Sequence, residues 1–525
     1  MILLLFYFLS FWPLLVNNGI FWDDWVLYHQ TPQTLTDLFG EAGSPPSAYF
    51  IRILVSVAPV FGKWFVFAVY LGAMLVVYQI LQDTKLFGKE ESLLLTLLSA
   101  VIPFNFARIA SVDAMYAVCY LLFLLAFLAL VKYMSGKRRR FRIVSLLLFF
   151  LSFGASSLLV FYVVALLYIG YCRRTSLGSL RGIVRTCVAH LDFLLIPVVF
   201  FAMKSLFFVP YGIYAGHNKI SLDNIARSPR EFLLTLGSSF ADVIGRSLIG
   251  AAGAVGISAL LLLVAYLALA GRVCEGARDV DAYRIRAWRF ALGAFLFYAG
   301  LLPYLAIGRR GATFGSEWES RDQLLLGIGA AFLLYYGLKY LFTRVHLGAG
   351  PQRLVFAVLV AAFVLANMGM YVRFQADWFK EVAFIENVKA IPVIRDNTTF
   401  AVVDRAASLN AMNRHIQFYE YNGMLRQAFG TTTRLAAPSV DIGVFANPAF
   451  LAMCVERPQY NFRNYVYSAP AHTIFIDPGT RTLGLASMAR LLAEEVFKPA
   501  AFRADVKNII DVTVEPAKQT AVPSP

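Results

Sequence analysis

The chain has 525 residues, of which 59% are hydrophobic and only 15% are charged, and its formal net charge is +15. A soluble domain usually carries about 25% charged residues, so this composition excludes an ordinary soluble protein and indicates a polytopic helical membrane protein. The positive charge does not indicate nucleic-acid binding, because most Lys and Arg residues lie in short loops between apolar runs, where they set topology. The five cysteines show neither a disulfide framework nor the Cys/His spacing of a zinc site.

Eleven apolar runs approach the roughly 20 residues that a helix needs to cross a bilayer. The first starts at Met1 without a preceding basic residue or a signal-peptide cleavage site, so we expect an uncleaved span. The run over 143–171 breaks at Gly154-Ala155-Ser156-Ser157 and is interpreted as two short helices, with one long tilted helix as the alternative. The predicted spans are 2–20, 62–82, 92–104, 114–133, 143–153, 156–171, 190–208, 250–270, 289–306, 323–341 and 354–371.

Basic residues are distributed unevenly between the loops on the two sides of these spans. Lys and Arg are more than threefold denser in one set of loops, with Lys137-Arg138-Arg139-Arg140 as its clearest anchor, and the positive-inside rule makes that set cytoplasmic. The N-terminus is then cytoplasmic, and the loops 17–61, 209–249 and 307–322 are extracytoplasmic, on the outer face of a bacterial inner or plasma membrane. No repeat period stands out, so the sequence shows no signature of an inverted-repeat transporter.

From residue 372 the composition becomes that of a soluble domain on the same outer side. Short buried strands are predicted at 399–403 and 473–476, helices at 408–429 and 483–497, and a disordered end at 518–525. A segment of roughly 150 residues is long enough to bury its own core. The predicted fold class is therefore mainly α, with a transmembrane helical bundle of about 11 spans over 1–371 and a small extracytoplasmic α/β domain over 372–525.

The stretch Phe21-Trp22-Asp23-Asp24-Trp25 directly follows the first span. A carboxylate near the hydrocarbon boundary loses hydration, which raises its pKa toward that of a useful general base. Acidic residues and tryptophans also mark ordinary helix ends at the membrane surface, which is the alternative interpretation. The rest of the 17–61 loop favours a reaction centre, because its capping residues and prolines predict short interfacial helices rather than a plain turn.

This arrangement resembles the GT-C superfamily of integral-membrane glycosyltransferases, which place an acidic pair in a long first external loop and often add a soluble C-terminal domain on that side. The resemblance implies a polyprenyl-phosphate-linked sugar as donor, a glycan, lipid or protein as acceptor, and membrane lipid as surroundings. It also implies inversion at the anomeric carbon, with one of the two aspartates as general base. The sequence does not separate the two; Asp24 is taken as the better-placed one, and Asp23 then binds the acceptor or a metal. A divalent cation, Mg²⁺ or Mn²⁺, would have to use this pair, because the sequence offers no other cluster.

A second charged group lies in the 308–322 loop, on the same predicted side as the acidic pair. Arginine can donate two parallel hydrogen bonds to phosphate oxygens; the alternative is a loop with internal salt bridges. Lys204, near the outer end of a span, either binds phosphate or extends to the interface. The predicted donor-phosphate-binding residues are Arg309, Arg310, Arg321, Lys204 and Arg246, and the predicted acceptor-binding residues are Trp25, His29, Glu317 and Glu319.

Two other classes of function are compatible with the sequence: a transporter or flippase of a lipid-linked saccharide, and a non-enzymatic assembly protein whose C-terminal domain binds a glycan. No Walker A sequence or dinucleotide fingerprint is present, which argues against nucleotide-driven transport and against a cytoplasmic nucleotide-sugar enzyme. The unusual charges gather at the outer ends of the spans, which favours the enzyme. Among them, Arg108 and Asp113 are close enough in sequence to pair with each other.

Overall fold

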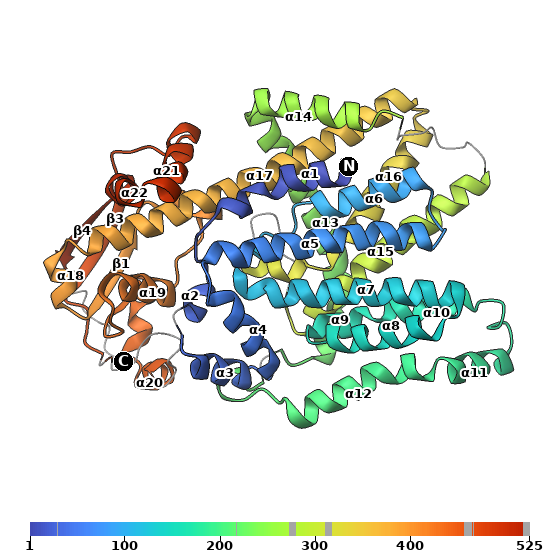
Figure 1. Ribbon diagram of the computed structural model, residues 1–525, viewed down its shortest axis with the longest axis horizontal. Helices are drawn as coiled ribbons and strands as arrows, with labels where there is room; N and C mark the ends of the chain where they lie inside the picture. The colour runs from blue at the N-terminus through green and yellow to red at the C-terminus, as the bar shows by residue number, and fades with distance from the viewer. Residues whose placement is uncertain are drawn as a thin grey trace.

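The structure is a computed structural model, and it describes residues 1–28, 30–216, 218–271, 280–309, 318–455, 465 and 467–517. The chain is 74% helical and has one small sheet near its C-terminus. Figure 1 shows long helices side by side in a bundle, with the sheet and its surrounding helices at one end of that bundle. This arrangement confirms the mainly helical architecture with a small α/β part at the C-terminus.

Six helices within the described ranges are long and apolar enough to cross a membrane. A seventh span results if α11 (Leu180–Ala189) and α12 (Leu191–Phe207), bent by 59° against each other, are counted as one. The six are α5 (Pro59–Asp83), the segment Ser111–Gly136 containing α7 (Ala114–Gly136), α13 (Leu222–Gly253), the part Ala287–Ala306 of α15 (Val280–Ala306), α16 (Leu326–Arg344) and α17 (Ala349–Val388).

The predicted number of about 11 spans is not confirmed, because several apolar runs form helices shorter than a full crossing. For example, α6 (Lys89–Val101) has 13 residues and α14 (Val255–Ala268) has 14, whereas a crossing takes about 20. The break in the 143–171 run is confirmed, since α8 (Arg139–Ser152) ends there and a new helical stretch begins. The remaining short helices of the bundle are α1 (Ile2–Phe11), η1 (Trp12–Val16), α9 (Ser156–Phe161) and α10 (Val163–Cys172).

The segment 209–249 was predicted to be an external loop. This prediction is wrong over most of the segment, because α13 begins at Leu222 and runs for 32 residues. Its buried face is a stripe of small residues, Ser228, Thr235, Ser239, Val243 and Ser247. Small side chains let helices approach closely, and α13 packs against α15 and α17. Charged residues in its first turns, such as Arg227, Arg230 and Glu231, made this segment resemble a loop in the sequence.

Three short helices form the predicted excursion after the first span: α2 (Asp24–Leu27), α3 (Pro32–Glu41) and α4 (Pro45–Val55). The hydroxyl of Thr31 accepts the backbone N–H of Thr34 at 3.1 Å and caps α3, while prolines open α3 and α4. Figure 1 places the three helices at the end of the bundle that carries the C-terminal sheet. The early loop and the late domain therefore lie next to each other.

The C-terminal sheet has four strands in the order β2-β1-β3-β4. The central strand β1 is parallel to β2 and β3, and β4 is antiparallel to β3, with Val402 opposite Ile474 in the register of β1 and β3. The strands predicted at 399–403 and 473–476 are confirmed. The strands are β1 (Thr399–Asp404), β2 (Leu435–Pro438), β3 (His472–Pro478) and β4 (Ile510–Pro516), and the helices are α18 (Pro392–Asp396), α19 (Phe418–Phe429), α20 (Pro448–Val455), α21 (Leu485–Phe497) and α22 (Pro499–Val506).

The helix predicted at 408–429 is shorter than expected and begins at Phe418 as α19. Met412 and Asn413 before it have φ of +59° and +53°, a left-handed conformation that ends a helix. The helix predicted at 483–497 is confirmed as α21, and the predicted disordered end, 518–525, lies outside the described residues. The 40-residue α17 passes through the predicted domain boundary at 371/372, so one continuous helix connects the bundle to the sheet (Figure 1).

A fully buried guanidinium joins α17 to the C-terminal domain. Arg414 contacts Asp377 at 2.7 Å, Glu381 at 2.6 Å and Glu420 at 2.6 Å, and all four side chains are 0% exposed. The backbone N–H of Trp22, in the early acidic loop, donates to the same Glu420 at 3.1 Å. The network therefore holds the acidic loop, the long helix and α19 together.

Replacing Arg414 with Met is expected to destabilise the protein strongly, because it leaves three carboxylates buried without their cation. Breaking a buried ion pair by removing one partner costs roughly 3–5 kcal/mol. Thermal unfolding of the purified protein in detergent measures this loss. The matched control is Arg490→Met, which removes an exposed arginine paired with Glu494 and should leave the melting temperature nearly unchanged. Equal melting curves for Arg414→Met and the unchanged protein would contradict this role.

Candidate functional site

The candidate site is built on a strained turn at the start of α2. Trp22 has φ of +48°, a conformation that residues other than glycine rarely adopt. Such strain persists only where the surroundings hold it, and here Glu420 holds the Trp22 backbone while the Trp22 ring lies 5.3 Å from that of Trp318. The turn sends the next two side chains, Asp23 and Asp24, into different environments.

Asp24 is fully buried and holds the start of the α7 span. Its Oδ2 accepts the backbone N–H of Ser111 at 2.7 Å, and its Oδ1 accepts that of Val112 at 2.8 Å. Burial raises the pKa of Asp24 to about 6, although these two backbone hydrogen bonds and the charge of Lys63 oppose the shift. With 0% exposure, Asp24 acts as a support between α2 and α7 and does not face solvent.

Asp23 is the accessible member of the pair. Its side chain is 41% exposed, yet burial raises its pKa above the ordinary value, with the charge of Arg321 and the hydroxyl of Tyr419 opposing the shift. Because a carboxylate that is both accessible and desolvated is expected in a concave part of the surface, we infer a recess at Asp23. Tyr419 donates to Oδ1 at 3.2 Å, and Nη1 of Arg321 lies 4.0 Å from Oδ2.

Arg321 lies opposite Asp23 with its hydrogen-bond donors largely unused. Its guanidinium stacks on Trp318 at 4.2 Å and lies 4.0 Å from Asp23 and from Asp322. Within the part of the chain that the structure describes, it donates no hydrogen bond to these carboxylates. Asp322 is instead bound by Arg309, whose Nη1 donates to both carboxylate oxygens at 3.0 Å. Arg321 is therefore the cation of this site with donors left for an anion.

A third carboxylate, Asp113, completes the site. It is 4% exposed, and neither of its oxygens has a hydrogen-bond partner among the described residues. Its nearest charges are those of Arg321, Asp24, Asp23 and Asp322. A buried polar group without a partner is costly and calls for an explanation, and a ligand that donates hydrogen bonds would supply one. The site thus combines unused donors on Arg321 with unused acceptors on Asp113.

The structure brings together only part of the predicted set. Asp23 and Arg321 meet in one recess, and Arg309 lies behind them on Asp322. Lys204 donates to Ser156 at 2.6 Å, and Arg246 pairs with Asp242 on its own helix at 2.6 Å, so both are committed elsewhere. Glu319 is exposed and lies two residues before Arg321. The predicted residues His29, Arg310 and Glu317 lie outside the described ranges.

Trp25, predicted to contact the acceptor, is a packing residue instead. It is 1% exposed, and its ring lies against α19 so closely that a Cβ added to Gly423 would come within 2.5 Å of it. A glycine at this point of α19 lets the acidic loop and the C-terminal domain approach each other. This close contact leaves no room for a sugar on the tryptophan face.

Sequence reasoning missed Tyr419 and Trp318 as residues of this site. Tyr419 belongs to the C-terminal domain, and nothing in the sequence shows that the first turn of α19 lies beside Asp23. Trp318 lies in η5 (Trp318–Gln323), a segment that was considered only for its charges. The hydroxyl of Ser320 in this segment accepts the backbone N–H groups of Phe106 and Ala107 at 3.2 and 2.9 Å, and these bonds anchor η5 under Arg321.

The described residues do not fit a divalent cation. No group of three His, Cys, Asp or Glu side chains within the described ranges could hold a metal ion. Both oxygens of Asp24 are already bound by backbone N–H groups, so the acidic pair does not present two carboxylates to one ion. The chemistry below is therefore derived without a metal.

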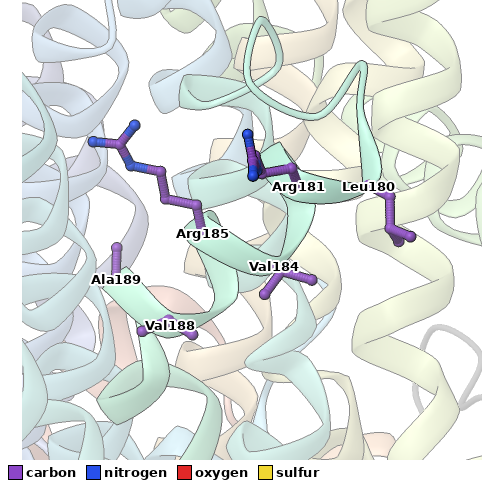
Figure 2. Close-up of a pocket in the computed structure, with 6 residues that line it drawn as sticks. All are labelled: Leu180, Arg181, Val184, Arg185, Val188 and Ala189. Carbon is purple, nitrogen blue, oxygen red and sulfur yellow. The ribbon is translucent and has the colours of Figure 1, made fainter.

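A hollow of about 650 Å³ lies elsewhere, along α11. Figure 2 shows Arg181 and Arg185 extending to one side of this helix and Val184 and Val188 lying on another. The hollow contains no carboxylate and no aromatic ring among its lining residues. We therefore place the candidate site at Asp23 and not on α11.

Comparisons with protein families and with curated proteins find no match to this chain.

Asp24→Asn is expected to lower stability by about 1–3 kcal/mol, because an Asn NH₂ would face a backbone N–H and leave it without an acceptor. The matched control is Asp23→Asn, which changes an accessible carboxylate of the same pair and should unfold at the temperature of the unchanged protein. Thermal unfolding in detergent separates the two. The opposite order, with Asp23→Asn the less stable, would contradict the supporting role of Asp24.

Proposed function

We propose that this chain is an integral-membrane glycosyltransferase, a hexosyl- or pentosyltransferase of the GT-C type. It would move a sugar from a polyprenyl-phosphate donor to an extracytoplasmic glycan, lipid or protein. The observation that carries the proposal is the meeting of Asp23 and Arg321 in one recess at the end of an apolar helical bundle. A base and an anion-binding cation at that distance suit the transfer of a group away from phosphate.

Asp23, rather than Asp24, is the base in this proposal. A general base must reach the proton that it removes, and Asp23 is accessible while Asp24 is buried and bound by two backbone N–H groups. The sequence pointed to Asp24 as the base, and the proposal gives that role to Asp23 instead. The raised pKa of Asp23 moves it toward the range in which a carboxylate removes protons effectively.

The proposed reaction is a single displacement. Asp23 takes the proton of the acceptor hydroxyl as that oxygen bonds to the anomeric carbon of the donor. The bond between this carbon and the phosphate oxygen breaks, and its electron pair stays on the phosphate. Arg321 neutralises the developing charge through its unused N–H donors, and the configuration at the anomeric carbon inverts because attack and departure occur on opposite faces.

Two further features support this arrangement. Asp113 has two oxygens without partners, and sugar hydroxyls are donors that such a carboxylate can bind. The site lies at the end of the bundle that carries the C-terminal domain (Figure 1), and the distribution of basic residues favours the extracytoplasmic side for this end. Acceptors on the cell surface would then reach the recess beside α19.

Asp23→Asn is expected to abolish sugar transfer, with a loss of at least about 100-fold, because it removes the general base. The assay uses purified protein with polyprenyl-phosphate sugars and extracted cell-surface acceptors, analysed by mass spectrometry.

Arg309→Gln is the comparison variant in the same loop and should retain more transfer than Arg321→Gln, because Arg309 is committed to Asp322. Full transfer by a folded Asp23→Asn protein would remove the catalytic assignment, and saccharide translocation without transfer would favour the transporter.

The rate of transfer is expected to fall as the pH falls through the raised pKa of Asp23, because only the ionised carboxylate accepts a proton. Tyr419→Phe removes the hydroxyl that stabilises this carboxylate, so it should shift the acid limb to higher pH by up to about one unit. The pH profile of kcat/KM measures the shift. A Tyr419→Phe profile with an unchanged acid limb would contradict the contact between Tyr419 and the base.

A further inference from the structure

Arg108 is a second unpaired cation, and the proposed reaction does not use it. Its guanidinium lies between two aromatic rings, 4.5 Å from the centre of Phe11 and 4.4 Å from that of Tyr70. Its Nε donates to the backbone oxygen of Asn105 at 3.0 Å. Neither Nη group donates to any acceptor among the described residues, and no described carboxylate lies within ion-pair distance. An unpaired arginine at the end of apolar helices is costly and indicates a ligand.

The expected pairing of Arg108 with Asp113 does not occur. No ion pair joins the two, and the charges nearest to Asp113 are those of Arg321 and the other site aspartates. Arg108 instead lies among tyrosines, with Tyr7, Tyr70, Tyr120 and Tyr371 as its neighbours. Arg108 and Asp113 therefore do not neutralise each other.

A cavity of about 60 Å³ opens beside Arg108. This volume holds several water molecules and is comparable with a phosphate group. Its lining combines the polar residues Arg108, Asn105 and Tyr120 with the apolar residues Ala73 and Val77 of α5. Such a mixed lining suits a polar head attached to a hydrocarbon chain.

A second polar atom of this cavity also lacks a partner. Asn105 is 6% exposed, and its Oδ1 has no hydrogen-bond partner within the described ranges, whereas its Nδ2 donates to the hydroxyl of Tyr70 at 3.2 Å. A ligand that satisfies both residues must accept from the Nη groups of Arg108 and donate to Asn105. A phosphate that carries a P–OH or a neighbouring hydroxyl does both.

We propose that this cavity binds the phosphate head of a lipid, with Arg108 donating to the phosphate oxygens and the chain lying along α5. The proposal is independent of sugar transfer at Asp23. Two sources share this chemistry: a polyprenyl monophosphate and an anionic phospholipid of the surrounding membrane. Guanidinium groups bind phosphate by parallel hydrogen bonds, and here the flanking aromatic faces keep the guanidinium in place.

Lipid binding to the purified, delipidated full chain tests this site by native mass spectrometry. The probes are farnesyl phosphate, phosphatidylglycerol and phosphatidylcholine. Arg108→Gln is expected to weaken binding of the preferred anionic lipid about tenfold or more, because it removes a charge-assisted hydrogen bond. Ala73→Leu places a larger side chain in the apolar part of the cavity lining and should weaken lipid binding as well. This variant tests the site if Arg108→Gln does not fold. Arg246→Gln, at an exposed arginine of α13, is the matched control and should bind as the unchanged protein does.

Each outcome is decisive. Preference for farnesyl phosphate with dependence on Arg108 supports the site and identifies a polyprenyl phosphate as its source. Preference for phosphatidylglycerol with the same dependence supports the site and identifies a membrane phospholipid. Binding of phosphatidylcholine equal to both anionic lipids, or unchanged binding by folded Arg108→Gln and Ala73→Leu, overturns the proposal and leaves a hydrated cavity only.

Discussion

The buried ionic network around Arg414 fixes how the helical bundle and the C-terminal domain sit against each other. A charge removed from water must be paired and hydrogen-bonded, and this guanidinium finds its partners on two separate elements, Asp377 and Glu381 on α17 and Glu420 on α19. Glu420 also accepts the backbone N–H of Trp22 and thereby fixes the position of the acidic loop. Because the partners are few and their geometry is demanding, α17, α19 and the acidic loop have one relative position.

That position gives the two adjacent aspartates different tasks. Asp24 is directed into the protein, where it accepts two backbone N–H groups at the start of the α7 span. Asp23 is directed into the recess between the bundle and α19, where Tyr419 and Arg321 approach it. One residue fixes the geometry of the loop, and the other is available for chemistry. An acidic pair in a sequence therefore need not be two equivalent carboxylates.

Much of the architecture could be predicted from the sequence. Long uniformly apolar runs such as α5 and α7 identify themselves by hydropathy, and the strands β1 and β3 by their short β-branched runs between turn residues. The helix α13 was missed, because charged residues in its first turns obscure the apolar stretch that follows, and its packing face consists of small polar residues against α15 and α17. The late start of the helix predicted at 408–429 was also missed, because Met412 and Asn413 before it have left-handed backbone conformations.

For the site, the sequence indicated that early carboxylates and late arginines share one location, and Asp23 and Arg321 do meet. It could not separate Asp23 from Asp24, since their difference arises from the α7 backbone that approaches only one of them. It also favoured Trp25 as a ligand-binding residue, whereas the contact with Gly423 of α19 makes it a packing residue. Ion pairs decide which charges remain for a ligand: Asp322 binds Arg309 within the same loop, and Arg321 keeps its donors.

The most direct test of this account is the structure of the Asp23→Asn protein with a polyprenyl-phosphate sugar bound. The account predicts that the donor phosphate lies within hydrogen-bonding distance of Arg321 and that the anomeric carbon faces residue 23 across the recess. A donor bound with its phosphate away from Arg321, or with its sugar separated from residue 23 by packed helices, would contradict it.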